Sequence, residues 1–330
     1  MAEFLTFDTD LTAVANAIRV KGGTSAQLIY PSGFVSAIQA IQTGITPKLV
    51  VTTTPGAAIT ATPAEGFKVV KGTAGADGMC TLELPKAGTW HVTAMANSVS
   101  NSQHIVIGTQ NMLLPLYHDT FANNTWEEII TVCRTGIAPD SWAVGDSKTM
   151  NIGGTAYQVD IIGKNHDEYA DGSGTAPLTF QLHDCYSEAK QMYSTNLSGL
   201  GWKNTDMRLT YLPAILALMP AEVQNGIHAV NKKTSEGGNS TTIEIVSDTL
   251  FLLSEVEIFG TASSSVAGEG SQYDYYKAGN PKIKKREGVD EFWWERSSAS
   301  GGMFGRVRAN GQAGASNASS SLGVSFAFCF

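Results

Sequence analysis

Apolar residues near the start of the chain recur with the spacing of an α-helix. A first short helix is indicated by four residues on one helical face, Leu11, Val14, Ala15 and Ile18. It is expected to end at Gly22-Gly23, and a second helix is expected to start near Pro31. The stripe of the second helix consists of Phe34, Val35, Ile38 and Ile41. Two helices this short cannot bury both stripes, so residues 1–45 are predicted to pack on another chain or subunit.

The apolar spacing changes to a period of two after residue 45. Leu82 and Leu84, and then Trp90, Val92 and Ala94, alternate with polar or small neighbours, and glycine-containing turns separate the runs. This pattern predicts a small antiparallel β-sandwich over residues 46–110. We interpret it as a spacer without chemistry of its own.

Residues 111–330 mix both periods and predict a larger domain with one core. A Thr-x-x-Glu capping box at Thr125 and Glu128 begins a helix, and strands are expected around a turn at Gly153-Gly154. Helical stretches are predicted over about 187–193 and about 206–231, the second divided by two prolines. "DTLFLLSEVEIFG" and the final "GVSFAFCF" are expected to be strands. The fold class predicted for the chain is α+β.

Composition and charge narrow the possible partners. The 22 Lys+Arg against 30 Asp+Glu give a formal charge of -8, which argues against nucleic acid. The one basic run, Lys282 to Glu287, is interpreted as a solvated loop. No apolar stretch approaches the length of a membrane span and no export signal is recognised, so no membrane insertion is expected. The four cysteines are widely spaced, which favours buried reduced thiols over zinc or disulfides.

The C-terminal segment places small polar residues between strong hydrophobic anchors. The anchors expected in the core are Trp293, Trp294, Val307, Val324, Phe326 and Phe328. The residues expected to project outward and bind a ligand are Glu295, Ser298, Ser300, Met303, Arg306, Arg308, Asn310 and Gln312. A rigid core that displays adaptable polar residues suits a binding surface, because ordering loops on association costs affinity. The alternative is a plain Gly/Ser-rich surface loop.

Three other groups of residues could carry chemistry. Residues 165–171 offer oxygen ligands for Ca²⁺ but lack EF-hand spacing, so a hydrogen-bonded turn is preferred and no metal or other cofactor is expected. His183 and Cys185 are too near in sequence to form a nucleophile–base pair by themselves. Glu255 and Glu257 are expected on one face of a strand, with a structural role preferred over paired-carboxylate catalysis.

Several stretches resemble phage proteins. "ANAIRVKGGTSAQLIYPSGFVSAIQAI" resembles the N-terminal segment of phage tail and tail-fibre proteins of Gram-positive hosts, and "GTWHVTAMANSVSNSQHIVI" is similar to the immunoglobulin-like modules behind it. "GWKNTDMRLTYL", "EGSQYDYY", "WWERS" and "GVSFAFCF" occur in the order seen in an uncharacterised phage family. That family resembles C-type-lectin-like domains related to sulfatase-modifying factor.

The resemblance implies a tail-tip or tail-fibre receptor-binding protein. Residues 1–45 would attach or oligomerise the chain, 46–110 would form an Ig-like spacer, and 111–330 would form a C-type-lectin-like ligand-binding domain. Expected partners are a bacterial cell-surface protein or glycan and other phage tail proteins, in a homo-oligomer expected to be a trimer. The protein would be made in the bacterial host cytoplasm and reside in the virion.

The same resemblance keeps two alternatives and one further expectation open. Relatives of this fold carry C-terminal segments diversified by retroelements, so a hypervariable surface is implied. One alternative is a sulfatase-modifying-like enzyme or a glycan depolymerase, although no catalytic residue is assigned and a non-enzyme is preferred. The other is a purely structural virion protein.

Overall fold

The computed structural model describes residues 8–22, 47–64, 66, 68–85, 87–97, 99–107, 110–134, 136 and 138–330. The chain divides into two compact units, 1–116 and 117–330, which we call unit 1 and unit 2. The architecture is mixed, with helices and mostly small antiparallel sheets, and is compatible with the predicted α+β class. Within the described ranges, no helix is both long enough and apolar enough to cross a bilayer.

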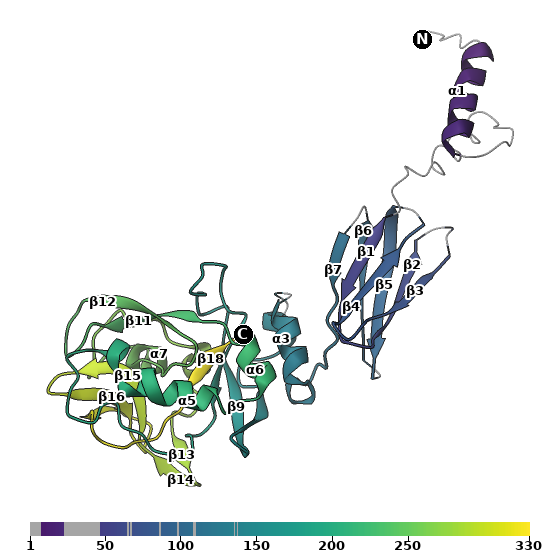
Figure 1. Ribbon diagram of the computed structural model, residues 1–330. Coiled ribbons are helices and arrows are strands. Elements are labelled where there is room, and N and C mark those ends of the chain that lie inside the picture. Colours follow the sequence, from purple (N-terminus) through teal and green to yellow (C-terminus); the bar gives the residue numbers. More distant parts are fainter. Residues whose placement is uncertain are drawn as a thin grey trace. The chain divides into compact units, whose positions relative to one another are not determined.

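Unit 1 contains two sheets that share a hydrophobic core (Figure 1). Its strands are β1 (Lys48–Thr52), β2 (Ala58–Pro63), β3 (Val70–Thr73), β4 (Met79–Glu83), β5 (Gly88–Ala96), β6 (Val99–Ile107) and β7 (Gln110–Leu113). One sheet has the order β4-β1-β7 and the other β3-β2-β5-β6. All pairs are antiparallel except β1 with β7. The predicted alternation holds in β5, where Trp90, Val92 and Ala94 are buried.

The predicted first helix is present as α1 (Asp8–Gly22). Ala15 and Ile18 of its apolar stripe are buried, whereas Val14 is exposed. The second predicted helix, with Phe34 to Ile41, lies outside the described residues.

Unit 2 carries short elements joined by long connections. Its helices are η1 (Phe121–Asn123), α3 (Trp126–Arg134), α4 (Ala138–Ser141), η2 (Trp202–Asn204), the π-helical η3 (Met207–Tyr211), α5 (Leu212–Leu216), α6 (Ala221–Gly226), α7 (Glu255–Phe259) and α8 (Asp274–Lys277). Its strands are β8 (Ser147–Ile152), β9 (Thr155–Lys164), β10 (Leu178–Leu182), β11 (Val230–Ser235), β12 (Ile243–Asp248), β13 (Lys284–Arg286), β14 (Val289–Glu291), β15 (Trp293–Ala299), β16 (Met303–Val307), β17 (Ala313–Asn317) and β18 (Ala327–Cys329).

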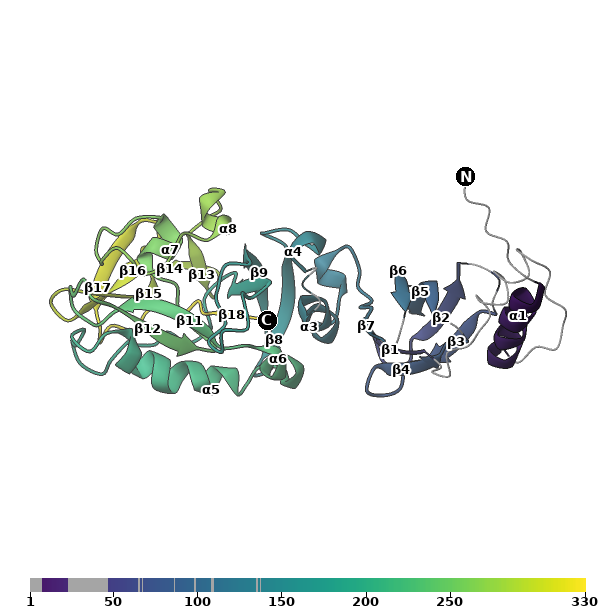
Figure 2. The ribbon, with the colours of Figure 1, turned by 90° about the horizontal axis from the view of Figure 1, so that it is seen from above.

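A four-stranded sheet of order β18-β10-β9-β8 forms one side of unit 2. The last strand, β18, is the edge strand next to β10, and Phe330 after it is buried. Phe326, Phe328 and Phe330 join the same hydrophobic cluster as Trp126 and Phe180. This core supports the separate sheet β15-β16-β17, which carries the C-terminal segment of interest (Figures 1 and 2).

Local signals in the sequence correctly predicted several elements of unit 2. Thr125 and Glu128 form the expected capping box, in which the Glu128 carboxylate accepts from the Thr125 N–H and the Thr125 hydroxyl accepts from the Glu128 N–H. Gly153 and Gly154 turn β8 into β9 with positive φ angles, a conformation that glycine adopts without strain. Pro220 lies between α5 and α6 and so divides the helical stretch after residue 206, as predicted. Pro213 does not divide it, because η3 continues directly into α5 and Pro213 occupies the first turn of α5, where proline is tolerated.

Several predictions of local structure are wrong. The helical stretch predicted to about residue 231 ends with α6 at Gly226, and β11 begins at Val230. Residues 249–254, predicted as part of a strand, form one isolated bridge at Phe251 instead. Residues 187–193 form no helix. Glu255 and Glu257 lie on helix α7 rather than on a strand, because Ser254 caps a short helical turn. The run Lys282 to Glu287 is not a fully solvated loop, because Lys284 is buried in β13 and its Nζ donates to the carbonyls of Leu182 and His183 at 2.6 and 2.8 Å. Burial lowers the pKa of Lys284 to about 8.

Candidate ligand-binding site

The C-terminal segment forms a small antiparallel sheet. β15 pairs with β16, and β16 pairs with β17. Gly301 and Gly302 turn β15 into β16 with φ angles of 67° and 76°, and the predicted turn at Asn310-Gly311 connects β16 with β17, Gly311 having a φ of 80°. The glycines that make this segment look unstructured are therefore the residues that let three strands turn within a short length of chain.

The outward and inward positions of this sheet follow the predicted pattern only in part. The six anchors expected in the core are all buried in the hydrophobic cluster of unit 2: Trp293, Trp294, Val307, Val324, Phe326 and Phe328. Of the residues expected outward, Ser300, Arg308, Asn310 and Gln312 are exposed, and Met303 and Arg306 are partly exposed.

The structure corrects the expectation for Glu295 and Ser298, which are fully buried. A register shift lies between Trp294 and Ser298 in the pairing of β15 with β16. Strict alternation therefore does not continue along β15, and its side chains are buried on both faces. Neither residue is accessible to a ligand.

Arg306 is held in a fixed orientation on the surface. Its guanidinium carbon lies 4.2 Å from the centroid of the Phe292 ring, and its Nε donates to the carbonyl of Ala315 at 3.1 Å. Phe292 is itself 36% exposed, so the stacked pair lies at the surface. The two terminal nitrogens of Arg306 have no hydrogen-bond partner in the described part of the chain. An arginine fixed in this way keeps its donor fork available for a ligand.

Arg308 lies across the neighbouring strand. A Cβ atom built on Gly314 of β17 would come within 2.7 Å of the Arg308 Nε. The Arg308 side chain can therefore lie over this position only because residue 314 is a glycine. Asn310 and Gln312 are tied to each other, because the Asn310 amide donates to the Gln312 side-chain oxygen and the Gln312 N–H donates back to Asn310. The loop that carries them packs against Ile283, because a Cβ atom built on Gly311 of this loop would lie 3.3 Å from the Ile283 side chain.

These contacts define one surface, which we call the arginine face: Ile283, Phe292, Arg306, Arg308, Asn310 and Gln312. It combines two cations, two amides, an aromatic ring and an exposed aliphatic side chain. Such a mixture can bind charged, hydroxylated or aromatic groups. The four polar members were predicted from sequence, whereas Phe292 and Ile283 were not. The available signal was an apolar residue inside the basic run for Ile283, and a position directly before β15 for Phe292.

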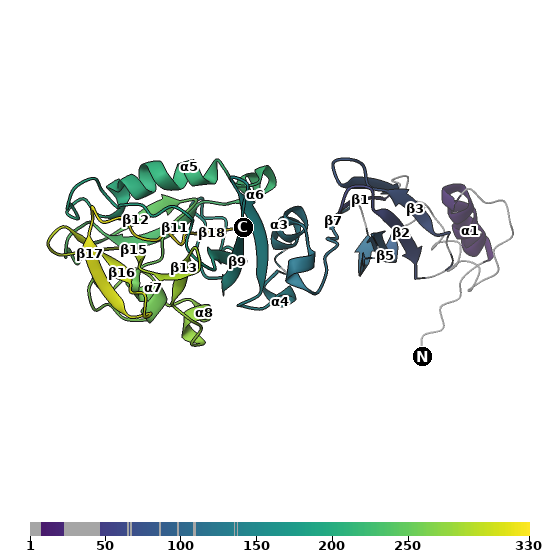
Figure 3. The same ribbon diagram turned by 90° about the horizontal axis from the view of Figure 1, so that it is seen from below.

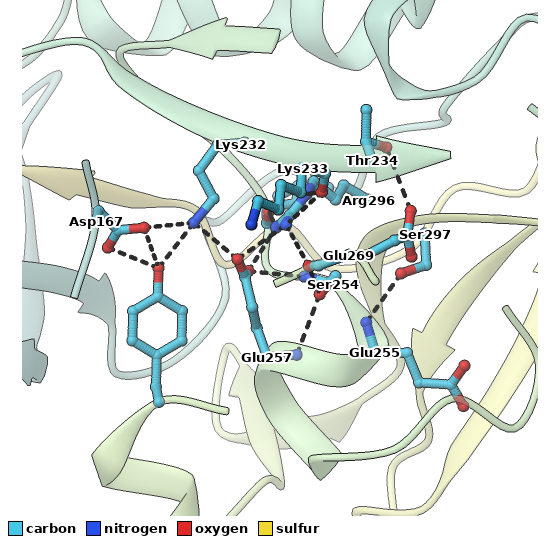
Figure 4. Close-up of polar contacts among 12 residues, drawn as sticks. Asp167, Lys232, Lys233, Thr234, Ser254, Glu255, Glu257, Glu269, Arg296 and Ser297 are labelled. Atoms are coloured by element: carbon cyan, nitrogen blue, oxygen red, sulfur yellow. Dashed lines mark hydrogen bonds and ion pairs between the residues drawn. The ribbon is translucent and has the colours of Figure 1, made fainter. Parts of the chain in front are cut away.

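A buried ionic network involves β15, a strand of the sheet that carries this face (Figure 4). At its centre Arg296 of β15 forms a bidentate pair with Glu257 of α7, with N–O distances of 2.5 and 2.8 Å. The same guanidinium donates to the carbonyls of Lys233, Leu252 and Glu269. One side chain therefore connects β15 to β11, to α7 and to two connecting segments.

Lys232 extends the network from β11. Its Nζ lies 2.6 Å from an Asp167 oxygen and 2.8 Å from a Glu257 oxygen, and it also donates to the Tyr273 hydroxyl at 3.0 Å. Burial opposes ionisation of Asp167, but the nearby Lys232 ammonium holds the pKa of that carboxyl far below its usual range. The same balance lowers the pKa of Glu257, where burial is outweighed by Arg296 and Lys232. All four groups are therefore charged and paired.

The two glutamates that the sequence analysis singled out have structural roles. Glu257 completes a capping box with Ser254 and also binds Arg296. Glu255 accepts hydrogen bonds from the backbone of Ser264 and Ser265 and from the hydroxyls of Ser263 and Ser265. Its carboxylate thus fixes a loop, which is the structural interpretation that the sequence favoured.

Glu295 differs from the other acidic residues described above. Among the residues that the structure describes, neither of its buried carboxylate oxygens has a hydrogen-bond partner, and a Cβ on Gly305 would come within 2.3 Å of one of them. Burial raises the pKa of Glu295 well above its ordinary value, and the nearby Glu255 and Glu269 raise it further. The residue is consequently held as a neutral acid.

The remaining chemical candidates lie elsewhere in unit 2. His183 pairs with Asp160 of β9, with 2.7 Å between the Nδ1 and Oδ2 atoms, and this hydrogen bond raises the pKa of His183. Cys185 is buried, which raises the pKa of its thiol to about 12. The four cysteines are free and buried, as the sequence predicted.

Residues 165–171 contribute Asp167 to the ionic network, as described above. His166 stacks on the Tyr273 ring with centroids 3.9 Å apart, and Asp171 accepts from the Ser173 N–H. In the ranges that the structure describes, no three histidine, cysteine or carboxylate side chains group as metal ligands would.

A cavity of about 300 Å³, which the apolar pattern did not predict, opens beside η3 and the end of β12. Its charged groups already bind one another, because Asp248 accepts from the Arg208 Nε at 2.6 Å and from the Trp202 indole at 2.8 Å. The arginine face, whose donors are open, is therefore the stronger candidate for a ligand site.

Unit 2 is thus a mixed α and β domain whose buried ionic network supports a displayed polar surface. A family model described as a domain of unknown function, DUF6273, matches residues 179–330, which include every residue of the arginine face. Among curated proteins, none matches the chain.

Proposed function

We propose that this chain is a receptor-binding protein of a phage tail, and that the arginine face of unit 2 binds a ligand on the bacterial surface. The observation that carries the proposal is that polar side chains with open donors are exposed on a strand whose partner is held rigidly. Arg306 of β16 is oriented by Phe292 and Ala315, and β15, which pairs with β16 in the same sheet, is fixed by Arg296 and its five acceptors. A surface held in this way loses little conformational entropy on binding.

The finer assignments belong to the same proposal. Residues 111–330 would have a C-type-lectin-like arrangement, 46–110 an Ig-like one, and 1–45 would join the chain to other tail proteins or to copies of itself. The pairing of β18 with β10, about 150 residues earlier in the chain, supports one domain that joins distant segments in a single sheet. Light scattering should then give three times the chain mass, and a monomer would contradict the oligomeric part.

The same proposal assigns no catalysis and no cofactor to the chain. A sulfatase-modifying-like mechanism needs a reactive thiolate, and burial raises the pKa of Cys185 to about 12 and that of Cys329 well above its ordinary value. A retroelement-diversified segment would reveal itself in the gene, as a near-copy of its 3′ end beside a reverse transcriptase.

The proposed site can be tested by blocking it, whatever its ligand. Since the native cysteines are buried, Gln312→Cys introduces an accessible thiol on the arginine face that can carry a bulky maleimide–polyethylene glycol. We expect the modified full chain to lose binding to bacterial cells in a flow-cytometry panel. The matched control is Arg134→Cys on α3, at the other end of unit 2 from β17 (Figures 2 and 3).

The control separates this proposal from its alternatives. Modified Arg134→Cys chain should bind cells as well as the unmodified chain. Equal binding by the two modified proteins would contradict the proposed site. Absence of binding to any strain by the unmodified chain would favour the structural virion protein, in which the arginine face contacts a neighbouring subunit.

A further inference from the structure

The arginine face carries positive charge that the described part of the chain does not neutralise. Arg306 and Arg308 form no ion pair there, and neither does Lys282, whose Cβ lies 3.8 Å from a Cβ built on Gly311. Arg286, by contrast, is paired with Glu291. An unpaired group of cations is unexpected on a chain with a formal charge of -8. Such a local surplus attracts anions.

The geometry of Arg306 matches an oxyanion in particular. Stacking on Phe292 and the bond from Nε to Ala315 fix the guanidinium plane and leave both terminal nitrogens available. A guanidinium presents these donors as a planar fork, which fits two oxygens of a carboxylate or phosphate at once. Because the plane is already fixed, the anion would not have to order it.

The two arginines also repel each other. Burial, and after it the charge of Arg308, lowers the pKa of Arg306. Contacts with two adjacent residues of β17 keep the arginines close. The Arg308 side chain packs against Gly314, and the Arg306 Nε donates to the carbonyl of Ala315. An anion bound between the guanidinium groups would convert this repulsion into two attractions.

We propose that the arginine face binds an oxyanion carried by a sugar polymer, namely the phosphate or carboxylate of an anionic glycan on the bacterial surface. This inference rests on the proposed function and specifies its ligand. The amides of Asn310 and Gln312 suit sugar hydroxyls, and the exposed parts of Ile283 and Phe292 suit the C–H faces of sugar rings. Phosphate and carboxylate share the chemistry that Arg306 and Arg308 recognise.

The test uses defined polymers and the full-length chain. Binding to poly(glycerol phosphate), to polygalacturonate and to uncharged dextran is measured by biolayer interferometry. We expect binding to at least one charged polymer, none to dextran, and weakening as salt rises from about 50 to about 500 mM. The two charged polymers distinguish a phosphate ligand from a carboxylate ligand.

Substitutions then locate the charge. Arg306→Gln and Arg308→Gln should each weaken binding about tenfold, because each removes charge-assisted hydrogen bonds. Arg306→Lys should recover only part of the loss, since lysine keeps the charge without the fork. The matched control, Arg134→Gln, makes the same charge change on α3 and should leave affinity unchanged. Arg308→Gln is the safer variant for folding, because the Arg308 side chain is exposed.

Each contrary outcome has a definite meaning. Failure of both charged polymers to bind, dextran binding of equal strength, or full affinity in the two glutamine variants would overturn the inference. If the chain nevertheless binds cells and the block at position 312 abolishes that binding, the proposed function stands with a different ligand. Loss of cell binding after protease treatment would then indicate a protein receptor.

Discussion

Lys232 and Arg296 are charged side chains in the interior of unit 2, where they are 2% and 0% exposed. Each is surrounded by oxygens, and together they neutralise Asp167 and Glu257. A buried ion pair adds less to stability than its Coulomb attraction suggests, because desolvation of both charges opposes it. Removing one partner is different, since it leaves the other charge buried without compensation.

Lys232→Met should therefore destabilise unit 2 by about 3 to 5 kcal/mol. It leaves Asp167 and Glu257 without their shared cation while keeping most of the side-chain volume. The measurement is the free energy of unfolding from urea denaturation. Lys277→Met is the control, because the exposed pair of Lys277 with Asp274 should contribute less than about 1 kcal/mol. Similar losses in the two variants would contradict the assigned role of Lys232.

Glu295→Gln should change how stability depends on pH. The folded-state pKa of Glu295 lies above its unfolded value of about 4.3. Its contribution is therefore fully present below that pH and declines as the pH rises toward the folded-state pKa. A glutamine does not titrate, so the variant should gain stability relative to the original chain as the pH rises above about 4.3.

Thermal melts at several pH values measure this difference. Glu236→Gln, which changes an exposed carboxylate, is the control and should leave the pH dependence as it was. Parallel pH profiles for the Glu295→Gln variant and the original chain would mean that Glu295 is not held neutral.

For single residues, the sequence predicted whether a side chain is buried more readily than it predicted which residues that side chain contacts. The burial of Trp293, Trp294, Phe326 and Phe328 followed from their side chains alone. Arg296 gave no such sign, because its partner Glu257 is 39 residues away in sequence. Glu295 was expected outward by alternation, and the register shift in β15, which depends on pairing with β16, could not be read from the strand itself.

Helix α7 shows how a short element depends on its ends. It spans only Glu255–Phe259, too short for apolar periodicity to be recognised, and it is defined by the Ser254 cap at its start and by Gly260 at its end, where φ is 76°. The Ser-x-x-Glu pattern at Ser254 and Glu257 was the available signal. The apolar run directly before it, residues 250–253, favoured a strand, so the capping pattern was not recognised as the start of a helix.

Ser254→Ala should cost more stability than the same kind of change at the cap of α3. Its hydroxyl accepts from the Glu257 N–H and donates to the Glu269 carbonyl, and all of these groups are buried. We expect a loss of about 2 kcal/mol, against about 1 kcal/mol for Thr125→Ala, whose hydroxyl bond to Glu128 is exposed. Urea denaturation measures both. An equal or smaller loss at Ser254 would show that its buried bonds add nothing to the cap.

The whole molecule has two hydrophobic cores that share no residue. The change from a helical to an alternating apolar period near residue 45, and to a mixture after 110, predicted a division into residues 1–45, 46–110 and 111–330, which stays a prediction beside the two compact units. The order of strands in the sheets was not predictable, because pairings such as β10 with β18 join residues about 150 positions apart.

Calorimetry should resolve two unfolding transitions, one for each core. Lys232→Met, which lies in unit 2, should lower the temperature of one transition and leave the other in place. A single transition that moves as a whole would mean that the units unfold cooperatively.

The glycines of the C-terminal sheet have a consequence for engineering. A Cβ at Gly302, Gly305 or Gly323 would meet neighbouring atoms at 2.4, 2.3 and 2.6 Å, so these positions should tolerate no other residue. The exposed positions 308, 310, 312 and 317 carry no such restriction. A combinatorial library would therefore randomise these four exposed positions and keep the three glycines. The domain would then serve as a scaffold for new binding specificities, because the space around each backbone position decides which residues can vary.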